Sequence, residues 1–320
     1  MRFLRFFTLL SLILAAILTI FFLSANAEKA APFFNAILMM GIPLILGFFL
    51  SKKLKVDLGL FGIGALTFII SQVFHIPFNS WVLNPLVERL GLQANPGSLN
   101  LALLGLLFGL SAGLFEETAR YIVYKKWLQD NLSWKEGLMF GAGHGGIEAF
   151  IFGALAFWGF IQLVTFQDIS PDAMAALVGL DKVDSVQSYL AAYWSAPWYY
   201  NLLGAVERVG AMAIHLCASV LVLQAFTRKK IGWYFLAVFW HTSVNAIAVY
   251  GSQTWNVYIT EGVVLLFGLA SLGIVFSLRK SEHYPKDELI PASQPSAPPL
   301  PLPGEPEEID KEKLEDSRYE

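Results

Sequence analysis

The chain is far more apolar than an ordinary soluble domain. Hydrophobic residues make up 56% of its 320 positions, charged residues only 15%, and the mean hydropathy is +0.56, which points to membrane spans. The net charge is −3 and the chain has no basic domain, which excludes nucleic acid as a partner. Cys217 is the single cysteine, so an intramolecular disulfide and a cysteine-built zinc site are both excluded. Any bound metal must therefore be held by histidine and carboxylate.

Runs of apolar residues predict about eight membrane-spanning helices. A span needs roughly 20 apolar residues to cross the hydrocarbon core, and it must be a helix because lipid offers no partners for backbone polar groups. We therefore predict an all-α fold, a polytopic membrane helix bundle. The candidate spans are Phe6–Leu23, Phe33–Leu50, Leu58–Phe74, Leu101–Tyr124, Gly137–Phe160, Leu202–Phe226, Trp233–Tyr250 and Val257–Leu278.

The first of these segments has two interpretations. Arg2 and Arg5 precede a long apolar run that ends in Ala25-Asn26-Ala27 before Glu28, an order typical of a cleavable signal peptide. The apolar run is longer than the roughly 7–15 residues usual in such peptides, so an uncleaved helix is an equal alternative. Residues 1–27 are thus predicted to be either a signal peptide or the first membrane span, which leaves seven or eight spans.

The rest of the chain divides into a membrane core and a tail. Residues 28–280 are predicted to form the polytopic core, in which we find no internal repeat of the kind seen in transporters built from two halves. From Ser281 onward the sequence is rich in proline and then acidic. Residues 281–320 are therefore predicted to be a disordered cytoplasmic tail.

Two connections are longer than turns. The stretch from His75 to Ser98 contains prolines around an apolar piece, which predicts a short interfacial helix with His75 at its border. The stretch from Asp168 to Tyr200 ends in a cluster of tyrosines and tryptophans. Such clusters are typical of the aromatic belt at a membrane surface.

Lysine and arginine fall almost entirely on one side of the predicted bundle. The opposite loops hold only Lys29, Arg89 and Lys182. Positive residues concentrate in cytoplasmic loops, so we predict a multi-pass cell-membrane protein, surrounded by lipids, with its C-terminal tail in the cytoplasm. The residues that share the basic side, if the spans alternate in direction, are Arg2, Arg5, Lys52, Lys53, Lys55, Lys125, Lys126, Lys135, Arg228, Lys229, Lys230, Arg279 and Lys280.

Ionisable residues inside the predicted spans gather at one depth. Such residues are costly in lipid and are functional hypotheses by default. At about 1.5 Å per residue from the cytoplasmic end of each span, Glu116, His144 and His241 lie roughly 10–12 Å deep and His215 roughly 16 Å deep. Four helices thus place Glu or His in one layer. The Glu207-Arg208 pair falls nearer the outer face and is predicted to be a separate structural pair.

Helical spacing groups these residues further. Three pairs share a helix face at a spacing of three or four residues: Glu116 or Glu117 with Arg120, His144 with Glu148, and His241 with Asn245. Arg120 can thus neutralise a glutamate and fix its rotamer. Small residues also flank His144, where another helix or a substrate backbone can approach closely; these are Gly141, Gly143, Gly145 and Gly146.

These residue types fit the hydrolysis of a peptide bond. A metal held by imidazoles and a carboxylate leaves a position for water, whose pKa falls toward ~7. A second glutamate then takes the proton, and His or Asn side chains donate to the tetrahedral oxyanion. Three alternatives remain open. They are a transporter or proton-relay protein that passes ions along the same residues, a non-catalytic scaffold with a peptidase core, and a haem protein with two histidine ligands.

Four motifs carry a family resemblance: Glu116-Glu117-Thr118-Ala119-Arg120, the run Phe140 to Glu148 (FGAGHGGIE), Glu207-Arg208 followed by His215, and His241-Thr242-Ser243-Val244-Asn245. With them, the chain from about Phe33 to Leu278 resembles the YhfC family of intramembrane metallopeptidases. That family is related to the CAAX prenyl endopeptidase and bacteriocin-processing group and to the PrsW proteases. The wider group has the motifs Glu-Glu-x-x-x-Arg, Phe-x-x-x-His and His-x-x-x-Asn/Asp. Here Arg120 is one residue closer to the glutamates, which leaves open whether Glu116 or Glu117 faces the site.

The resemblance implies an intramembrane endopeptidase that works through activated water. The catalytic residues it implies are Glu116, Glu117, His144, His241 and Asn245. It also implies a metal site, expected to hold Zn²⁺, whose ligands would come from His144, His241, Glu117 and His215, with Arg120 and Glu148 in support. The expected substrate is a membrane-embedded or lipid-modified peptide.

Overall fold

The computed structural model describes residues 27–279, and the regular structure in this range is helical throughout. The predicted signal peptide or first span and the predicted tail lie outside the described residues. Within the described range, the prediction of an all-α membrane bundle is confirmed.

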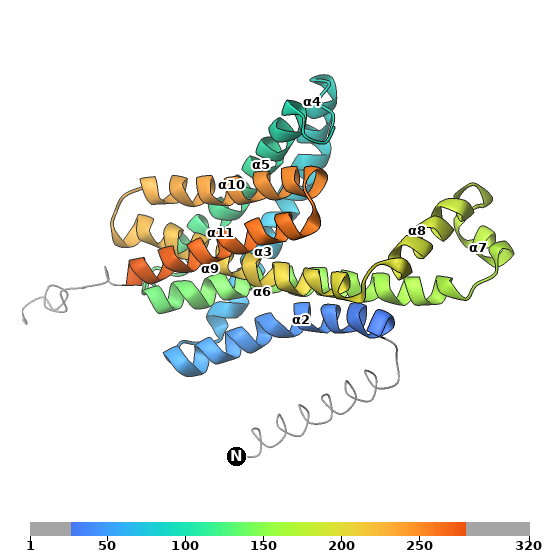
Figure 1. Cartoon of the computed structure of the whole chain (residues 1–320). Helices are drawn as coiled ribbons and strands as arrows, with labels where there is room; N and C mark the ends of the chain where they lie inside the picture. Colours follow the sequence, from blue (N-terminus) through green and yellow to red (C-terminus); the bar gives the residue numbers. More distant parts are fainter. Residues whose placement is uncertain (1–26, 280–320) are drawn as a thin grey trace, which may run out of the picture. The chain divides into compact units, whose positions relative to one another are not determined.

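The described chain forms a series of long helices joined by short turns and a few short helical pieces (Figure 1). In order they are α2 (Ala27–Leu54), α3 (Gly59–Phe78), the π-helical turn η1 (Asn79–Leu83), α4 (Asn84–Arg89), α5 (Leu99–Lys126), α6 (Trp134–Gln167), α7 (Pro171–Val178), η2 (Leu180–Lys182), α8 (Val183–Ser195), η3 (Trp198–Leu202), α9 (Leu203–Thr227), α10 (Gly232–Thr254) and α11 (Val257–Arg279).

Seven of the eight predicted spans fall on the seven long helices of the described chain. Six helical segments between residues 27 and 279 are long and apolar enough to cross a membrane. The long helix α10 has 23 residues, the length of a span, but it is not among these six. Its polar residues, His241 and Asn245 among them, lower its mean hydropathy.

The connection after the third predicted span differs from the prediction. Instead of a break at His75 followed by a separate interfacial helix, α3 continues through η1 into α4 as one helical segment, Gly59–Arg89. Pro77 lies inside α3 and Pro85 lies in the first turn of α4. Proline is tolerated in a first helical turn, and the π-helical turn between the two prolines changes the hydrogen-bond pattern without ending the helix.

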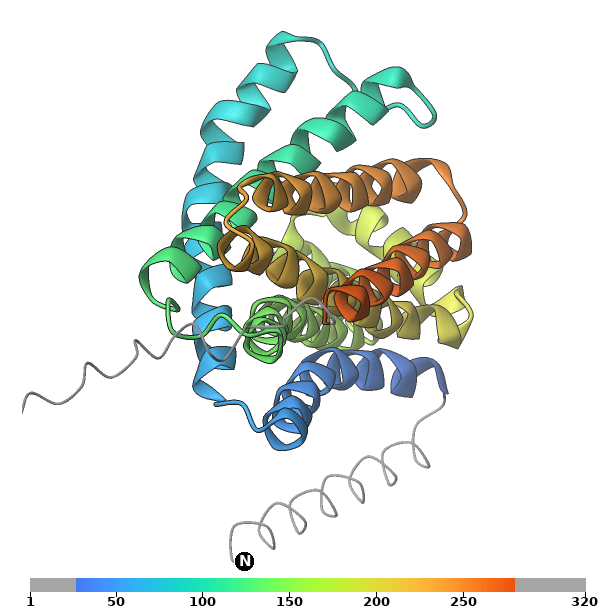
Figure 2. The ribbon, with the colours of Figure 1, turned by 90° about the vertical axis from the view of Figure 1, so that its left-hand side faces the viewer.

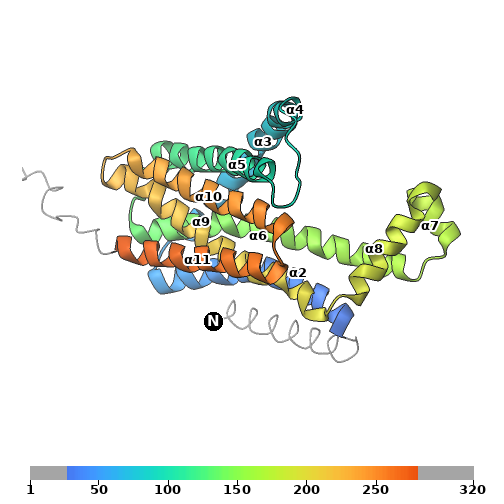
Figure 3. The same ribbon diagram turned by 45° about the horizontal axis from the view of Figure 1, so that its top comes forward.

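The connection from Asp168 to Tyr200 contains short helices of its own. In Figures 1 and 3, α7 and α8 lie beyond the end of α6. Met174 of α7 and Val183 and Leu190 of α8 are buried against one another. This small cluster is separate from the main core and does not reach the polar residues of the spans.

Capping residues set the start of the two helices that carry most of the candidate site. Ser98 accepts a hydrogen bond from the backbone N–H of Leu101 at 3.1 Å at the start of α5. Ser133 and Glu136 form a capping box at the start of α6, in which the carboxylate accepts from the Ser133 N–H at 2.9 Å. Fixed helix starts fix which residues of α5 and α6 face inward.

The helix α9 lies at the centre of the bundle and packs against α2, α5, α6, α10 and α11. Its residues from Met212 to Ala225 are all buried, as expected for a helix that is apolar on every side. One core cluster, which includes Leu50, Tyr124, Trp134, Leu223 and Leu278, joins the ends of five helices.

Basic residues are found at these same helix ends. Lys52 and Lys53 end α2, Lys125 and Lys126 end α5, and Arg279 ends α11, where its guanidinium lies 5.2 Å from the ring of Trp134. The prediction that basic residues share one end of the bundle is thus confirmed for the described helices. That this end faces the cytoplasm stays a prediction.

Glycines let α6 lie directly against its neighbours. A Cβ atom at Gly143 would lie 1.9 Å from the carbonyl oxygen of Phe61 in α3, and one at Gly64 would lie 2.0 Å from the carbonyl oxygen of Phe140. On the opposite face of α6, a Cβ at Gly145 would lie 2.8 Å from Cβ of His215 in α9. The glycines flanking His144 therefore serve close helix packing, and they bring α3, α6 and α9 together around the histidines.

Substitution of Gly143 tests this packing. Gly143→Ala forces the α3–α6 crossing apart and lowers the free energy of unfolding by about 1–3 kcal/mol or more. Thermal or SDS-induced unfolding of the purified protein in detergent measures the loss. Gly159→Ala is the matched control, because a Cβ at Gly159 in the same helix meets no atom within 4 Å. An equal loss in both variants would contradict the proposed crossing.

Candidate functional site

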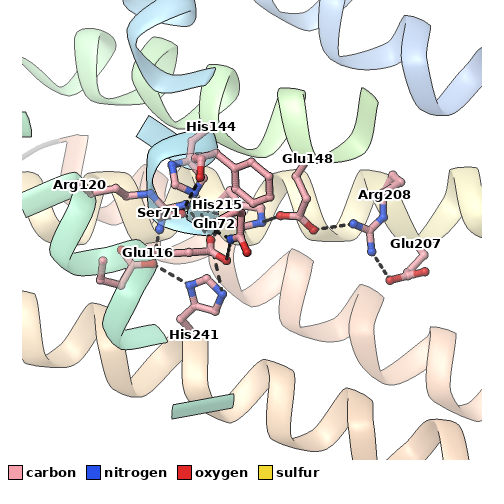
Figure 4. Close-up of polar contacts among 12 residues, drawn as sticks. Ser71, Gln72, Glu116, Arg120, His144, Glu148, Glu207, Arg208, His215 and His241 are labelled. Atoms are coloured by element: carbon pink, nitrogen blue, oxygen red, sulfur yellow. Dashed lines mark hydrogen bonds and ion pairs between the residues drawn. The ribbon is translucent and has the colours of Figure 1, made fainter. Parts of the chain in front are cut away.

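Glu116 lies at the centre of a buried polar cluster. Its Oε2 atom is 3.1 Å from Nε2 of His144, 3.9 Å from Nδ1 of His215 and 3.9 Å from Nε2 of His241 (Figure 4). The four residues come from α5, α6, α9 and α10, and each is buried. The layer of Glu and His predicted from residue depths is thus one compact cluster.

Glu117, the neighbouring residue, points to a different set of partners. Its carboxylate forms an ion pair with Arg120 and accepts a hydrogen bond from Nδ1–H of His241 at 2.7 Å. Glu117 and Arg120 are fully buried. The predicted role of Arg120 in neutralising a glutamate is therefore confirmed, with Glu117 as that glutamate, and Glu116 is the one that faces the imidazoles.

His215 has a carboxylate behind it as well. Its Nε2 lies 2.5 Å from Oε2 of Glu148, and Oε1 of Glu148 accepts from Arg208 at 2.7 Å. Arg208 also pairs with Glu207. The prediction that the Glu207-Arg208 pair stands apart from the cluster is therefore wrong for Arg208, and Glu207 is linked to the cluster through Arg208. Depth counted along a helix axis leaves out the length of the arginine side chain, which reaches Glu148 from α9.

A second chain of polar residues reaches Glu116 from α3. Gln72 donates from Nε2 to Oε1 of Glu116 at 3.2 Å, and its Oε1 accepts from Nδ1–H of His75 at 3.2 Å. Asn79 donates to Nε2 of His75 at 3.0 Å, and Ser111 donates to Oδ1 of Asn79 at 2.7 Å. The donors and acceptors alternate consistently along the chain, so it fixes the orientation of the Gln72 amide.

The sequence reasoning missed both Gln72 and His75. His75 was predicted to be interfacial, but it is buried and stacks on Phe115 with 5.4 Å between ring centroids. The prolines that predicted a helix end near His75 do not end the helix. A usable signal was present, because Gln72, His75 and Asn79 recur at a spacing of three and four residues on one face of an apolar segment.

Asn245 lies one turn after His241 on α10. It is half-buried where α10 packs closely on α5, with its Cβ 3.4 Å from the position that a Cβ of Gly109 would take. It therefore helps form the α5–α10 contact beside the cluster, and the catalytic role that the resemblance implies for it stays a prediction.

The tautomers of two histidines follow from their carboxylate partners. A carboxylate only accepts hydrogen bonds, so His241 carries its proton on Nδ1 toward Glu117, and His215 carries its proton on Nε2 toward Glu148. The lone pairs of His241 Nε2 and His215 Nδ1 then face the Glu116 carboxylate. Electron-rich atoms that converge in this way need positive charge between them, which a cation or a proton can supply.

Two cations fit this requirement. Arg120 is one, since its Nη2 lies 2.7 Å from Nδ1 of His215 and 3.9 Å from Oε2 of Glu116. A metal ion is the other, because Glu116, His144 and His215 each offer a donor atom within 4.8 Å of the other two. Metal and guanidinium would compete for Nδ1 of His215. The donor set and the carboxylate behind His215 fit a metal centre.

Of the ligands that the resemblance implies, His144 and His215 belong to this compact group. Glu117 has its Oε1 engaged by Arg120 and His241, and His241 lies beside the compact donor group, with its Nε2 3.9 Å from Oε2 of Glu116. A haem between two histidines does not fit. The ring centroids of His144 and His215 are 5.4 Å apart and those of His215 and His241 are 5.5 Å apart, and the Glu116 carboxylate already lies between their nitrogens.

A multi-pass helical bundle with a buried carboxylate–imidazole cluster defines a membrane protein with a candidate metal centre. The chain matches the model of the YhfC intramembrane metalloprotease family over residues 37–265, and it belongs to that family. It is 30% identical to the uncharacterized membrane protein YhfC of Bacillus subtilis (strain 168) over 209 residues, which are 65% of this chain and 79% of that protein. No solved structure matches the chain. The resemblance predicted from the four motifs is confirmed.

The buried Arg120–Glu117 pair predicts a double-substitution result. Arg120→Met leaves the Glu117 carboxylate buried without its cation and lowers the free energy of unfolding by about 3–5 kcal/mol. Adding Glu117→Gln removes the unpaired charge and restores part of that stability. Unfolding of the single and double variants in detergent measures both effects. A single variant as stable as the parent, or a double variant less stable than the single one, would contradict the pairing.

Proposed function

We propose that the protein is a membrane-embedded metallopeptidase that hydrolyses a peptide bond of a membrane-associated protein or peptide. The observation that carries the proposal is the convergence of three imidazoles on Oε2 of Glu116 in the buried core of the bundle. Family membership supports the same class of enzyme.

The metal we propose is Zn²⁺, held by Glu116, His144 and His215. Two imidazoles and one carboxylate form a ligand set typical of catalytic zinc in peptidases. When bound, the ion supplies Lewis-acid chemistry: it activates a water molecule and polarises the peptide carbonyl. Glu148 orients His215 from behind, and Arg208 holds Glu148.

His241 is the residue we propose to take the proton from water. Glu117 accepts from its Nδ1–H at 2.7 Å, which keeps the lone pair on Nε2. That lone pair faces the cluster 3.9 Å from Oε2 of Glu116. A carboxylate behind an imidazole fixes its tautomer and stabilises the imidazolium once the proton has arrived. His241 then returns the proton to the departing amine.

The remaining polar residues hold these groups in place. Gln72 binds Oε1 of Glu116, which leaves Oε2 directed at the imidazoles. Arg120, once it is displaced from Nδ1 of His215 by the metal, keeps its ion pair with Glu117 and adds positive charge where an oxyanion would form. The site needs such fixed partners because a buried polar group without a hydrogen bond is costly.

The peptidase proposal is tested by following new protein N-termini in cells. Cells that express the chain produce new N-termini within membrane proteins, and cells that express Glu116→Gln do not. Glu88→Gln is the matched control, because Glu88 lies exposed on α4. Quantitative N-terminal proteomics of membrane fractions at equal expression is the measurement. The same set of new N-termini with Glu116→Gln as with the parent would contradict the proposal.

The assignment of ligands and base is tested by combining metal content with rate. Glu116→Gln and His144→Ala are expected to lower the zinc content of the purified protein strongly, whereas His241→Ala keeps the zinc and lowers the cleavage rate about 10²–10⁴-fold. His283→Ala, in the predicted tail, is the histidine control. Elemental analysis and the cleavage rate of a substrate found by proteomics are measured. Loss of zinc in His241→Ala would contradict its assignment as base.

A further inference from the structure

A cleft of about 380 Å³ opens between α3 and α6 next to the candidate site. Its outer walls are apolar and face away from the bundle, with Val73 61% exposed and Phe152 46% exposed. Its lining includes Phe68, Gln72 and Val73 of α3 and Glu148, Ile151 and Phe152 of α6.

The cleft exists because α3 and α6 part after their close crossing. They touch at Gly64 and Gly143, and Figure 2 views α6 nearly along its axis with α3 running across it. Beyond the crossing, α6 follows α2, since a Cβ at Gly153 would meet Met39 and Met40. In the same interval α3 follows α5, where Gln72 reaches Glu116.

The inner wall of the cleft consists of side chains that contact the candidate site. The Phe68 ring packs edge-on against the His144 ring with 5.2 Å between centroids. Gln72 donates to Glu116 at 3.2 Å, and Glu148 accepts from His215 at 2.5 Å. A single layer of side chains therefore separates a molecule in the cleft from the cluster.

The depth of the cleft selects a membrane-embedded occupant. Glu148 lies 11 residues after Gly137, where the predicted membrane span within α6 begins; this is about 16 Å along the helix axis, near the middle of a hydrocarbon core about 30 Å thick. A lipid-modified peptide that stays at the membrane surface does not reach this depth, whereas a membrane-spanning segment does.

We propose that the α3–α6 cleft admits a membrane-spanning segment of a protein substrate sideways from the lipid, and that Gln72 binds its locally unwound backbone. The proposal rests on the proposed function and narrows its substrate class from membrane-associated to membrane-spanning. An unwound segment in lipid needs partners for its free N–H and C=O groups. The Oε1 atom of Gln72 accepts from His75 and keeps a second lone pair for a substrate N–H. An acyl chain has no N–H group that could donate to Gln72 Oε1.

A larger groove of about 650 Å³ lies on the other side of α3, against α5, and is lined by Ile70, Phe74 and Ile122 among others. Its hydroxyl groups are engaged: Thr67 and Ser71 donate to the backbone of α3, and Thr118 bonds to Tyr234 at 2.8 Å. This groove serves as the internal comparison, because it has the same apolar character without the contacts to the cluster.

Bulky substitutions in the two grooves separate the alternatives. Val73→Trp or Ile151→Trp fills the cleft and lowers the cleavage rate about 10²-fold, as expected when a substrate is kept from its bound position. Ile122→Trp in the larger groove and Leu266→Trp on exposed α11 leave the rate unchanged. Melting temperature and zinc content are measured for each and stay at the parent values. Parent-like cleavage by both cleft variants overturns the cleft proposal and leaves the peptidase proposal standing.

Photo-cross-linking tests binding without relying on cleavage. The Glu116→Gln protein carries p-benzoylphenylalanine at Val73, at Ile122 or at Leu266, and is reconstituted with a biotinylated leucine-rich peptide of about 23 residues with a Gly-Ala-Ser centre. Cross-linking at Val73 and not at the other two positions supports the cleft proposal. If the parent protein shows no cleavage, the same cross-linking result still supports the cleft, and the peptidase proposal alone fails. No cross-link at Val73, or a stronger one at Ile122, overturns the cleft proposal.

Discussion

Buried carboxylates determine much of the interior of this bundle. Glu116, Glu117 and Glu148 lie within membrane-spanning helices, where an unpaired charge costs several kcal/mol. Glu117 is balanced by Arg120 and Glu148 by Arg208. Among the described residues, the guanidinium nearest to Glu116 is that of Arg120 at 3.9 Å, and three imidazoles surround the Glu116 carboxylate. This environment fits the metal centre that we propose.

Close helix packing makes this arrangement of charges possible. The imidazoles meet because Gly143 and Gly145 let α3 and α9 approach α6 at backbone distance. On the other side, a Cβ at Gly109 would lie 2.7 Å from the carbonyl oxygen of Thr242, which brings α10 and His241 against α5. Small residues at helix interfaces are the usual means of association in lipid, where the hydrophobic effect between helices is absent. Here the same residues also set the distances between the polar groups.

The sequence predicts the helices and the polar layer because ionisable residues are conspicuous in apolar runs. It cannot tell Glu116 from Glu117, since both lie at helical spacing from Arg120 and only the packing of α5 against α6 and α10 decides which carboxylate meets which histidine. The sequence does not single out Gln72, because a neutral amide in a predicted span is less unusual than an ionisable side chain. Residue counting places Arg208 apart from the cluster because it leaves out the length of the side chain, which reaches Glu148.

The length of the helical segment from Gly59 to Arg89 has a consequence for how the protein responds to its lipid surroundings. Its 31 residues extend about 46 Å, whereas the 23 residues of α11 extend about 35 Å. A bilayer core of about 30 Å suits α11 nearly upright but leaves the longer segment mismatched, and mismatch is relieved by tilt. A thinner bilayer therefore increases the tilt of this segment, and of the 34-residue α6 that packs on α3, more than that of α11. Membrane thickness thereby changes the tilt of the long helices on one side of the bundle.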